Sequence, residues 1–77
     1  MPKTHDSPEF RKFVCENIDD LIKRSGITKM KISDDLNVET STLSKYTNGT
    51  MIPSPEKIKK LCLILNCKYE DILGSLD

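Results

Sequence analysis

The sequence has few aromatic residues and almost no histidine. Its 77 residues include no tryptophan, two phenylalanines, two tyrosines and one histidine. That histidine, His5, lies in an N-terminal stretch without apolar periodicity, and no nucleophile, base and orienting group can be placed together. We therefore expect that the protein is not an enzyme and has no catalytic residue.

Long apolar runs are also absent. No stretch approaches the roughly 18 apolar residues that a membrane-spanning helix needs, and the first residues lack the apolar region of a signal peptide. We expect a cytoplasmic protein that does not interact with membranes.

Cysteine is scarce, and its count is odd. Cys15, Cys62 and Cys67 leave one thiol over in any pairing, which argues against a secreted disulfide scaffold. Cys62 and Cys67 have no nearby histidine or third cysteine, so a zinc site would lack ligands. We interpret the thiols as reduced, small hydrophobic side chains and expect no metal ion and no cofactor.

The sequence has no net charge, because 12 basic residues balance 12 acidic ones. Nucleic-acid-binding domains usually carry an excess of basic residues, so the sum counts against that class until the surface positions of the charges are known. A chain this short, with 36% hydrophobic and 31% charged residues, predicts one compact helical domain with one small core. We expect residues 1–7 to form a flexible tail and residues 8–77 to form the domain.

The apolar spacing predicts five helices and no strand. Ser7-Pro8-Glu9 and Ser54-Pro55-Glu56 each combine a cap, a first-turn proline and a first-turn acid, which mark helix starts. Thr28 can cap a second helix, and Glu39 is a possible cap for a third. The apolar and small residues expected on the inner faces of the first two helices are Phe10, Phe13, Val14, Ile18, Leu21, Ile22, Ile32, Ser33 and Leu36.

The second and third helices are separated only by "LNV", residues 36–38, so they must cross steeply. Two short helices joined in this way form a helix-turn-helix, whose second helix enters the major groove of DNA. The stretches "GITKMKISDDLNVETSTLSKYTNG" and "PSPEKIKKLCLILNCKYEDIL" resemble the lambda-repressor-like (Cro/XRE-type) family over about residues 17–74. The resemblance implies an all-α, compact five-helix DNA-binding domain.

The resemblance also implies a set of DNA contacts on the helix near residues 40–47, its recognition helix. Base-facing positions are then Thr40, Ser41 and Lys45. The alternative for Thr40 and Ser41 is that they only cap the helix. Lys45 lies one turn further along the same face and favours contact.

Phosphate contacts are implied for Thr42, Ser44 and Asn48. Lys29 stands where the family often has Gln, and it places a cation at a helix N-terminus, where phosphate binds readily. In the opposite sense, Glu39 and the pair Asp34-Asp35 would repel DNA near the expected groove.

The function implied by the resemblance is a sequence-specific transcriptional regulator of double-stranded DNA, most simply a repressor. It would bind a pseudo-palindromic operator as a homodimer, formed in solution or only on DNA, with Phe10, Phe13 and the last helix with Leu76 as candidate dimer surfaces. No small-molecule ligand is inferred. The alternative is a protein-interaction module that keeps the fold but has weak or no specific DNA binding.

Overall fold

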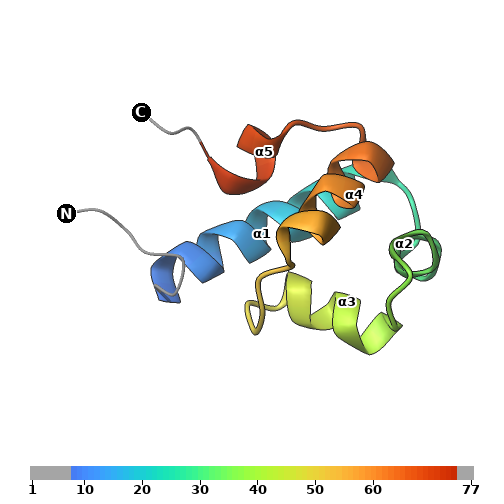
Figure 1. Cartoon of the computed structure of the whole chain (residues 1–77), viewed down its shortest axis with the longest axis horizontal. Coiled ribbons are helices and arrows are strands. Elements are labelled where there is room, and N and C mark those ends of the chain that lie inside the picture. The colour runs from blue at the N-terminus through green and yellow to red at the C-terminus, as the bar shows by residue number, and fades with distance from the viewer. Residues whose placement is uncertain (1–7, 75–77) are drawn as a thin grey trace.

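The structure, a computed structural model, describes residues 8–74, and Figure 1 shows the arrangement of their five helices. The helices are α1 (Pro8–Ser25), α2 (Lys29–Leu36), α3 (Thr40–Thr47), α4 (Pro55–Leu65) and α5 (Tyr69–Leu73). No strand occurs in this part of the chain, so the predicted all-α, five-helix architecture is confirmed. The expected tail, the cap at Ser7 and the dimer candidate Leu76 lie outside the described residues.

Two helix starts are capped by the side chains expected from the sequence. Thr28 Oγ1 accepts a hydrogen bond of 3.2 Å from the Lys31 amide at the start of α2. Ser54 Oγ accepts one of 3.3 Å from the Lys57 amide at the start of α4. Both bonds occupy an amide that has no partner within its own helix.

The turn between α2 and α3 depends on Asn37, which has a left-handed backbone with φ of 59°. Asparagine adopts this conformation more readily than most residues, and there it ends the helix and reverses the chain. The amides of Asn37 and Val38 donate to the carbonyls of Asp34 and Ser33, respectively. The short turn therefore satisfies its own backbone groups and fixes the angle between the two helices.

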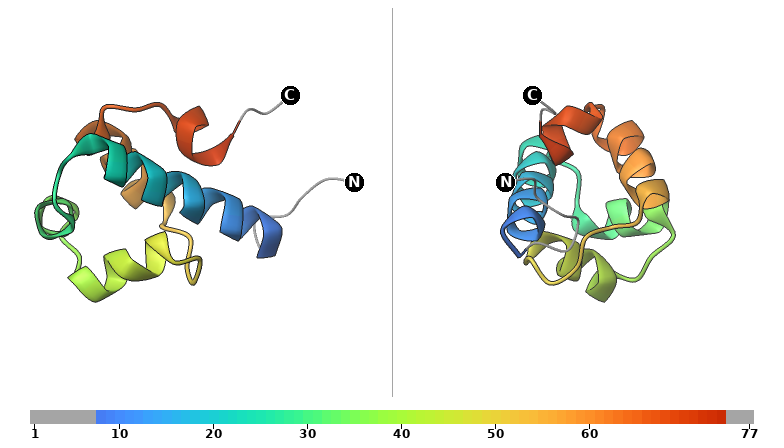
Figure 2. Two further views of the ribbon diagram at one scale, coloured as in Figure 1. Left: turned by 180° about the vertical axis from the view of Figure 1, so that it is seen from behind. Right: turned by 60° about the vertical axis from the view of Figure 1, so that its left-hand side comes forward.

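The core forms around α1, which runs through the middle of the molecule. Figures 1 and 2 show α5 along one side of α1 and α3 along the other, and these are the two helices that α1 contacts most. The buried apolar side chains are Val14, Cys15, Ile18, Ile22, Ile32, Leu36, Leu43, Tyr46, Ile58, Leu61 and Ile72. None of the helices within residues 8–74 is long and apolar enough to cross a bilayer.

The inner face of α1 differs from the expected one at two residues. Cys15 is buried, with 1% of its surface exposed, whereas Phe13 remains 43% exposed. Cys62 and Cys67 are half-buried, so the interpretation of the thiols as small hydrophobic side chains holds fully only for Cys15. The ring of Phe13 lies near Gly74 at the end of α5, and much of its remaining surface faces solvent.

Candidate nucleic-acid interface

The helix-turn-helix is held from beneath by an apolar inner face. Leu36 of α2 and Leu43 of α3 are fully buried, and Tyr46 is 6% exposed. Ser33, a small residue of α2, is buried as well, and its hydroxyl donates a hydrogen bond of 2.8 Å to the Met30 carbonyl. The buried hydroxyl on the inner face of α2 is therefore not left without a partner.

Burial of Leu43 and Tyr46 turns the rest of α3 outward. Because a helix repeats every 3.6 residues, Thr40 and Ser44 lie in one row and Ser41 and Lys45 in the next. All four are exposed, whereas Thr42 is only partly exposed. The structure therefore brings the three residues predicted to face bases and the Ser44 hydroxyl onto one outer face, and it leaves Thr42 at the edge of that face.

The N-terminus of α3 has no side-chain cap. Its N-cap residue is Glu39, whose side chain makes no capping hydrogen bond, and only the amides of Thr42 and Leu43 reach the Glu39 carbonyl. Thr40 and Ser41 are the first two helical residues, so the alternative that they serve as caps is wrong. The positive end of the helix dipole is consequently open toward solvent, next to the two hydroxyls.

The C-terminus of α3 leads into a compact loop that uses one side of Asn48. Asn48 Oδ1 accepts hydrogen bonds from both the amide and the hydroxyl of Thr50, the former at 3.0 Å. The amides of Thr50 and Met51 also donate to the Lys45 carbonyl, each at 3.2 Å. The carboxamide NH₂ group of Asn48 is thus the part of this side chain that the loop does not use.

Charge near the helix-turn-helix is evenly balanced. Within residues 8–74, three acids each pair with a cation four residues away on the same helix. Asp19 pairs with Lys23 and Asp20 with Arg24 in α1, and Asp35 pairs more loosely, at 3.4 Å, with Lys31 in α2. Such exposed pairs add little stability, but each compensates an acid locally. Asp34 and Glu39 are exposed without an ion pair, as are Lys29 and Lys45. Neither sign of charge therefore predominates among the unpaired residues around the helix-turn-helix, and no basic surface stands out there.

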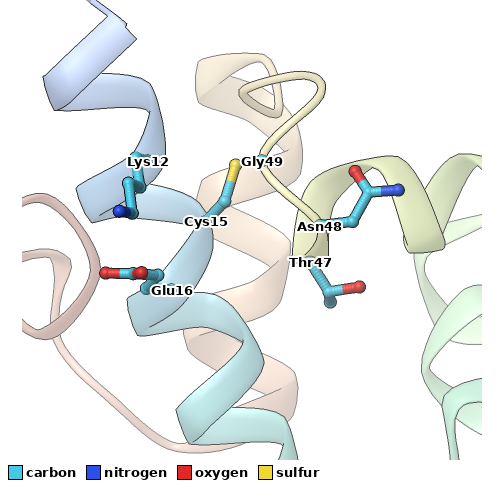
Figure 3. A pocket seen from close by; sticks show the side chains of 6 residues that line it. All are labelled: Lys12, Cys15, Glu16, Thr47, Asn48 and Gly49. Carbon is cyan, nitrogen blue, oxygen red and sulfur yellow. The ribbon is translucent and has the colours of Figure 1, made fainter.

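A shallow depression lies beside the end of α3 (Figure 3). Its walls are Lys12, Cys15 and Glu16 of α1 on one side and Thr47, Asn48 and Gly49 on the other. Cys15 points from α1 toward the Gly49 backbone, and burial raises the pKa of its thiol. The thiol is therefore kept in its neutral form, in which it donates a weak hydrogen bond of 3.4 Å to the Met51 carbonyl.

Arg11 is the residue at this site that the sequence analysis missed. Its Nε donates a hydrogen bond of 3.2 Å to the carbonyl of Gly49, which is 38 residues away in the sequence. No local pattern signals such a contact, because Arg11 reads as an ordinary polar position on the outer side of an amphipathic helix. Among residues 8–74 no group of three or more His, Cys, Asp and Glu side chains could hold a metal ion.

Comparison with known proteins agrees with this geometry. The chain matches the family of Cro/C1-type HTH DNA-binding domains over residues 17–75. It is 34% identical over 61 residues to Antitoxin PezA of Streptococcus pneumoniae serotype 4 (strain ATCC BAA-334 / TIGR4), an alignment that covers 79% of this chain and 39% of that protein. The chain thus spans well under half the length of this relative. No solved structure shows significant similarity to the chain. Because the family match includes both helices of the helix-turn-helix, the second half of α1, and α4 and α5, the chain belongs to the Cro/C1-type helix-turn-helix DNA-binding domains.

Proposed function

We propose that the chain is a sequence-specific transcriptional regulator, most simply a repressor, that reads DNA with α3. The observation that carries the proposal is the outer face of α3. There Ser41 and Lys45 are exposed in one row beside an uncapped helix N-terminus, on a helix anchored by the buried Leu43 and Tyr46. A short polar face on a rigid, closely supported helix is suited to the major groove.

Each predicted contact has a proposed role. Thr40, Ser41 and Lys45 would reach base edges, since they lie on the first turns of α3. Lys29, the exposed first residue of α2, would meet a phosphate at that helix's N-terminus. The remaining phosphate donors would be Thr42, Ser44 and Asn48.

A single domain would read only one half-site, so we propose a homodimer on a pseudo-palindromic operator. We propose that it acts in the cytoplasm. The two α3 helices would lie about 34 Å apart, one turn of DNA. Phe13, 43% exposed, remains a candidate for the dimer surface. Light scattering of the DNA complex tests this, since one chain per operator at saturation would contradict a dimer.

The second candidate function is a protein-interaction module. The exposed carboxylate of Glu39 at the N-terminus of α3 favours it, because it opposes the approach of phosphates. The name of the relative, an antitoxin, is compatible with a protein partner. Selection of bound fragments from random DNA separates the two candidates, since a module without specific binding would enrich no motif.

Two alanine variants test the proposed contacts with the selected site, one in α3 and one in α2. Lys45→Ala should weaken binding by about 1–3 kcal/mol and relax the preference at one base position. Lys29→Ala should weaken all sequences alike and reduce the salt dependence of binding by about one unit per half-site. Lys23→Ala, which removes an exposed cation at the end of α1, is the control.

A folded Lys45→Ala protein that binds the selected site as tightly and as selectively as the parent would refute DNA reading by α3. The interaction module would then be the better account of the chain.

A further inference from the structure

The N-terminal half of α1 precedes residue 17, where the family match begins, and it contacts the loop that follows α3. Arg11 Nε bonds to the Gly49 carbonyl at 3.2 Å, and Cys15 Sγ bonds to the Met51 carbonyl at 3.4 Å. Arg11 and Cys15 are four residues apart, so they lie on the same face of α1. Two side chains of one helix therefore bond to two loop carbonyls that are two residues apart.

The loop needs such support because it turns at a glycine. Gly49 has φ of 89°, and a glycine there has access to many backbone conformations in addition to the one observed. The other bonds described above, from Thr50 and Met51 to the Lys45 carbonyl, connect the loop only to the end of α3. The bonds from Arg11 and Cys15 connect it to a different helix and thereby fix its direction relative to the rest of the domain.

The place of the guanidinium also fits this role. Gly49 directly follows Asn48, the C-cap of α3, so a cation bonded to its carbonyl lies at the negative end of the helix dipole. Arg11 is half-buried, and its Nε–H is already used in this bond. Glu16, which lines the depression beside the end of α3, is exposed and forms no ion pair with Arg11.

We propose that Arg11 is a positioning residue for DNA binding: by holding Gly49 it presets the loop so that the Asn48 NH₂ group faces the phosphate backbone. The inference rests on the proposed function, since it assigns a phosphate to Asn48. A loop that is already ordered loses less conformational freedom on binding, so removing the hold weakens binding without removing a contact to DNA.

The variants that test this are Arg11→Ala and Arg11→Gln, with Arg24→Ala as the control. Glutamine carries its amide nitrogen the same number of bonds from Cα as the arginine Nε, so it can donate to the Gly49 carbonyl without a charge. Arg24→Ala removes the same residue type from the same helix, where it pairs only with Asp20 at the surface. Thermal unfolding of each variant checks that it folds.

The first measurement needs no DNA. Amide hydrogen exchange at Thr50 and Met51 should be faster in Arg11→Ala than in the parent, and near the parent rate in Arg11→Gln and Arg24→Ala. The second measurement is affinity for the selected DNA site. Arg11→Ala should bind about 3- to 10-fold more weakly with an unchanged salt slope, and Arg11→Gln should recover most of the loss.

A double-mutant cycle with Asn48→Ala then tests the coupling. Arg11→Ala should have little further effect on affinity once the Asn48 side chain is gone. The proposal is overturned if Arg11→Gln binds as weakly as Arg11→Ala with a salt slope lower by about one per half-site, because Arg11 would then bind phosphate itself. Faster exchange without any loss of affinity would overturn it too, while leaving DNA reading by α3 intact. A parent protein that enriches no DNA motif would refute the proposed function, and this inference with it.

Discussion

The ring of Phe13 packs directly against the backbone of Gly74. A Cβ atom placed on Gly74 would lie 2.9 Å from Phe13 Cε2 and 3.1 Å from Cζ. Gly74 ends α5 and also has φ of 85°, a region that other residues rarely adopt. The N-terminal half of α1 therefore meets the end of α5 through one aromatic ring and one residue that lacks a side chain.

Gly74→Ala should lower the free energy of unfolding by about 2–4 kcal/mol, because it combines backbone strain with a collision against the Phe13 ring. Gly26→Ala is the matched control. Gly26 has a similar φ of 74°, but no atom beyond its own chain neighbours lies within 4 Å of its added Cβ, so only the backbone cost of about 1 kcal/mol applies. Urea unfolding of both variants measures the difference. Equal losses would show that the ring moves aside freely.

A second contact between helices yields a prediction for stability. Lys57 Nζ of α4 donates a hydrogen bond of 2.9 Å to the Leu36 carbonyl, at the C-terminal end of α2. Lys57→Met keeps most of the apolar stem and removes the cation, so it should cost about 1–2 kcal/mol of stability. Lys59→Met, at an exposed position of the same helix, should change stability by less than about 0.5 kcal/mol. Similar midpoints for the two variants in urea would argue that the bond to Leu36 contributes nothing.

Local sequence signals predicted most of the fold because the helix boundaries depend on neighbouring residues. Thr28 and Ser54 cap as expected, since a capping hydroxyl needs only an amide three residues ahead. Ile32 and Leu36 are buried as their spacing indicated. The exception is Phe13, which is 43% exposed. Its exposure depends on which other elements cover that side of α1, and periodicity does not encode this.

The contacts that connect the helices could not be predicted from the sequence alone. Asn17 Nδ2 donates to the Ile72 carbonyl across 55 residues, and Arg11 bonds to Gly49 across 38. Both acceptors are backbone carbonyls, which every residue has, so the sequence carries no signal that selects them. The candidate site was predicted only in part for the same reason: the resemblance indicated the residues of α3, but not the support of the loop by α1. The DNA contacts themselves stay predictions.

The pH dependence of stability should reveal the environment of Cys67. Burial, with a smaller effect of the neighbouring Cys62 thiol, raises the pKa of Cys67 from 9.0 to about 12. Between these values the folded state keeps the proton that the unfolded state loses, so the free energy of unfolding falls as pH rises, and the contribution is complete below pH 9. The slope from one such group is at most about 1.4 kcal/mol per pH unit.

Cys67→Ala should therefore lose stability less steeply than the parent when urea unfolding is followed from about pH 8 to about pH 10.5. Burial also raises the pKa values of Cys15 and Tyr46, but both groups are present in the two proteins, so the difference between the curves isolates Cys67. Parallel curves would contradict a raised pKa at this thiol.

The last prediction concerns Glu39, where stability and DNA binding should respond in opposite directions. Its exposed carboxylate lies at the N-terminus of α3, where it interacts favourably with the helix dipole, so Glu39→Gln should cost about 0.5 kcal/mol of stability. The same change removes repulsion from phosphates, so affinity for all DNA sequences should rise several-fold at low salt, and the gain should shrink as salt is added. Asp34→Asn, which neutralises an exposed acid near the end of α2, is the control and should produce a smaller gain. If Glu39→Gln leaves DNA affinity unchanged at low salt, the N-terminus of α3 does not approach the phosphates. A charge at that end of a helix inserted in the groove would change the affinity.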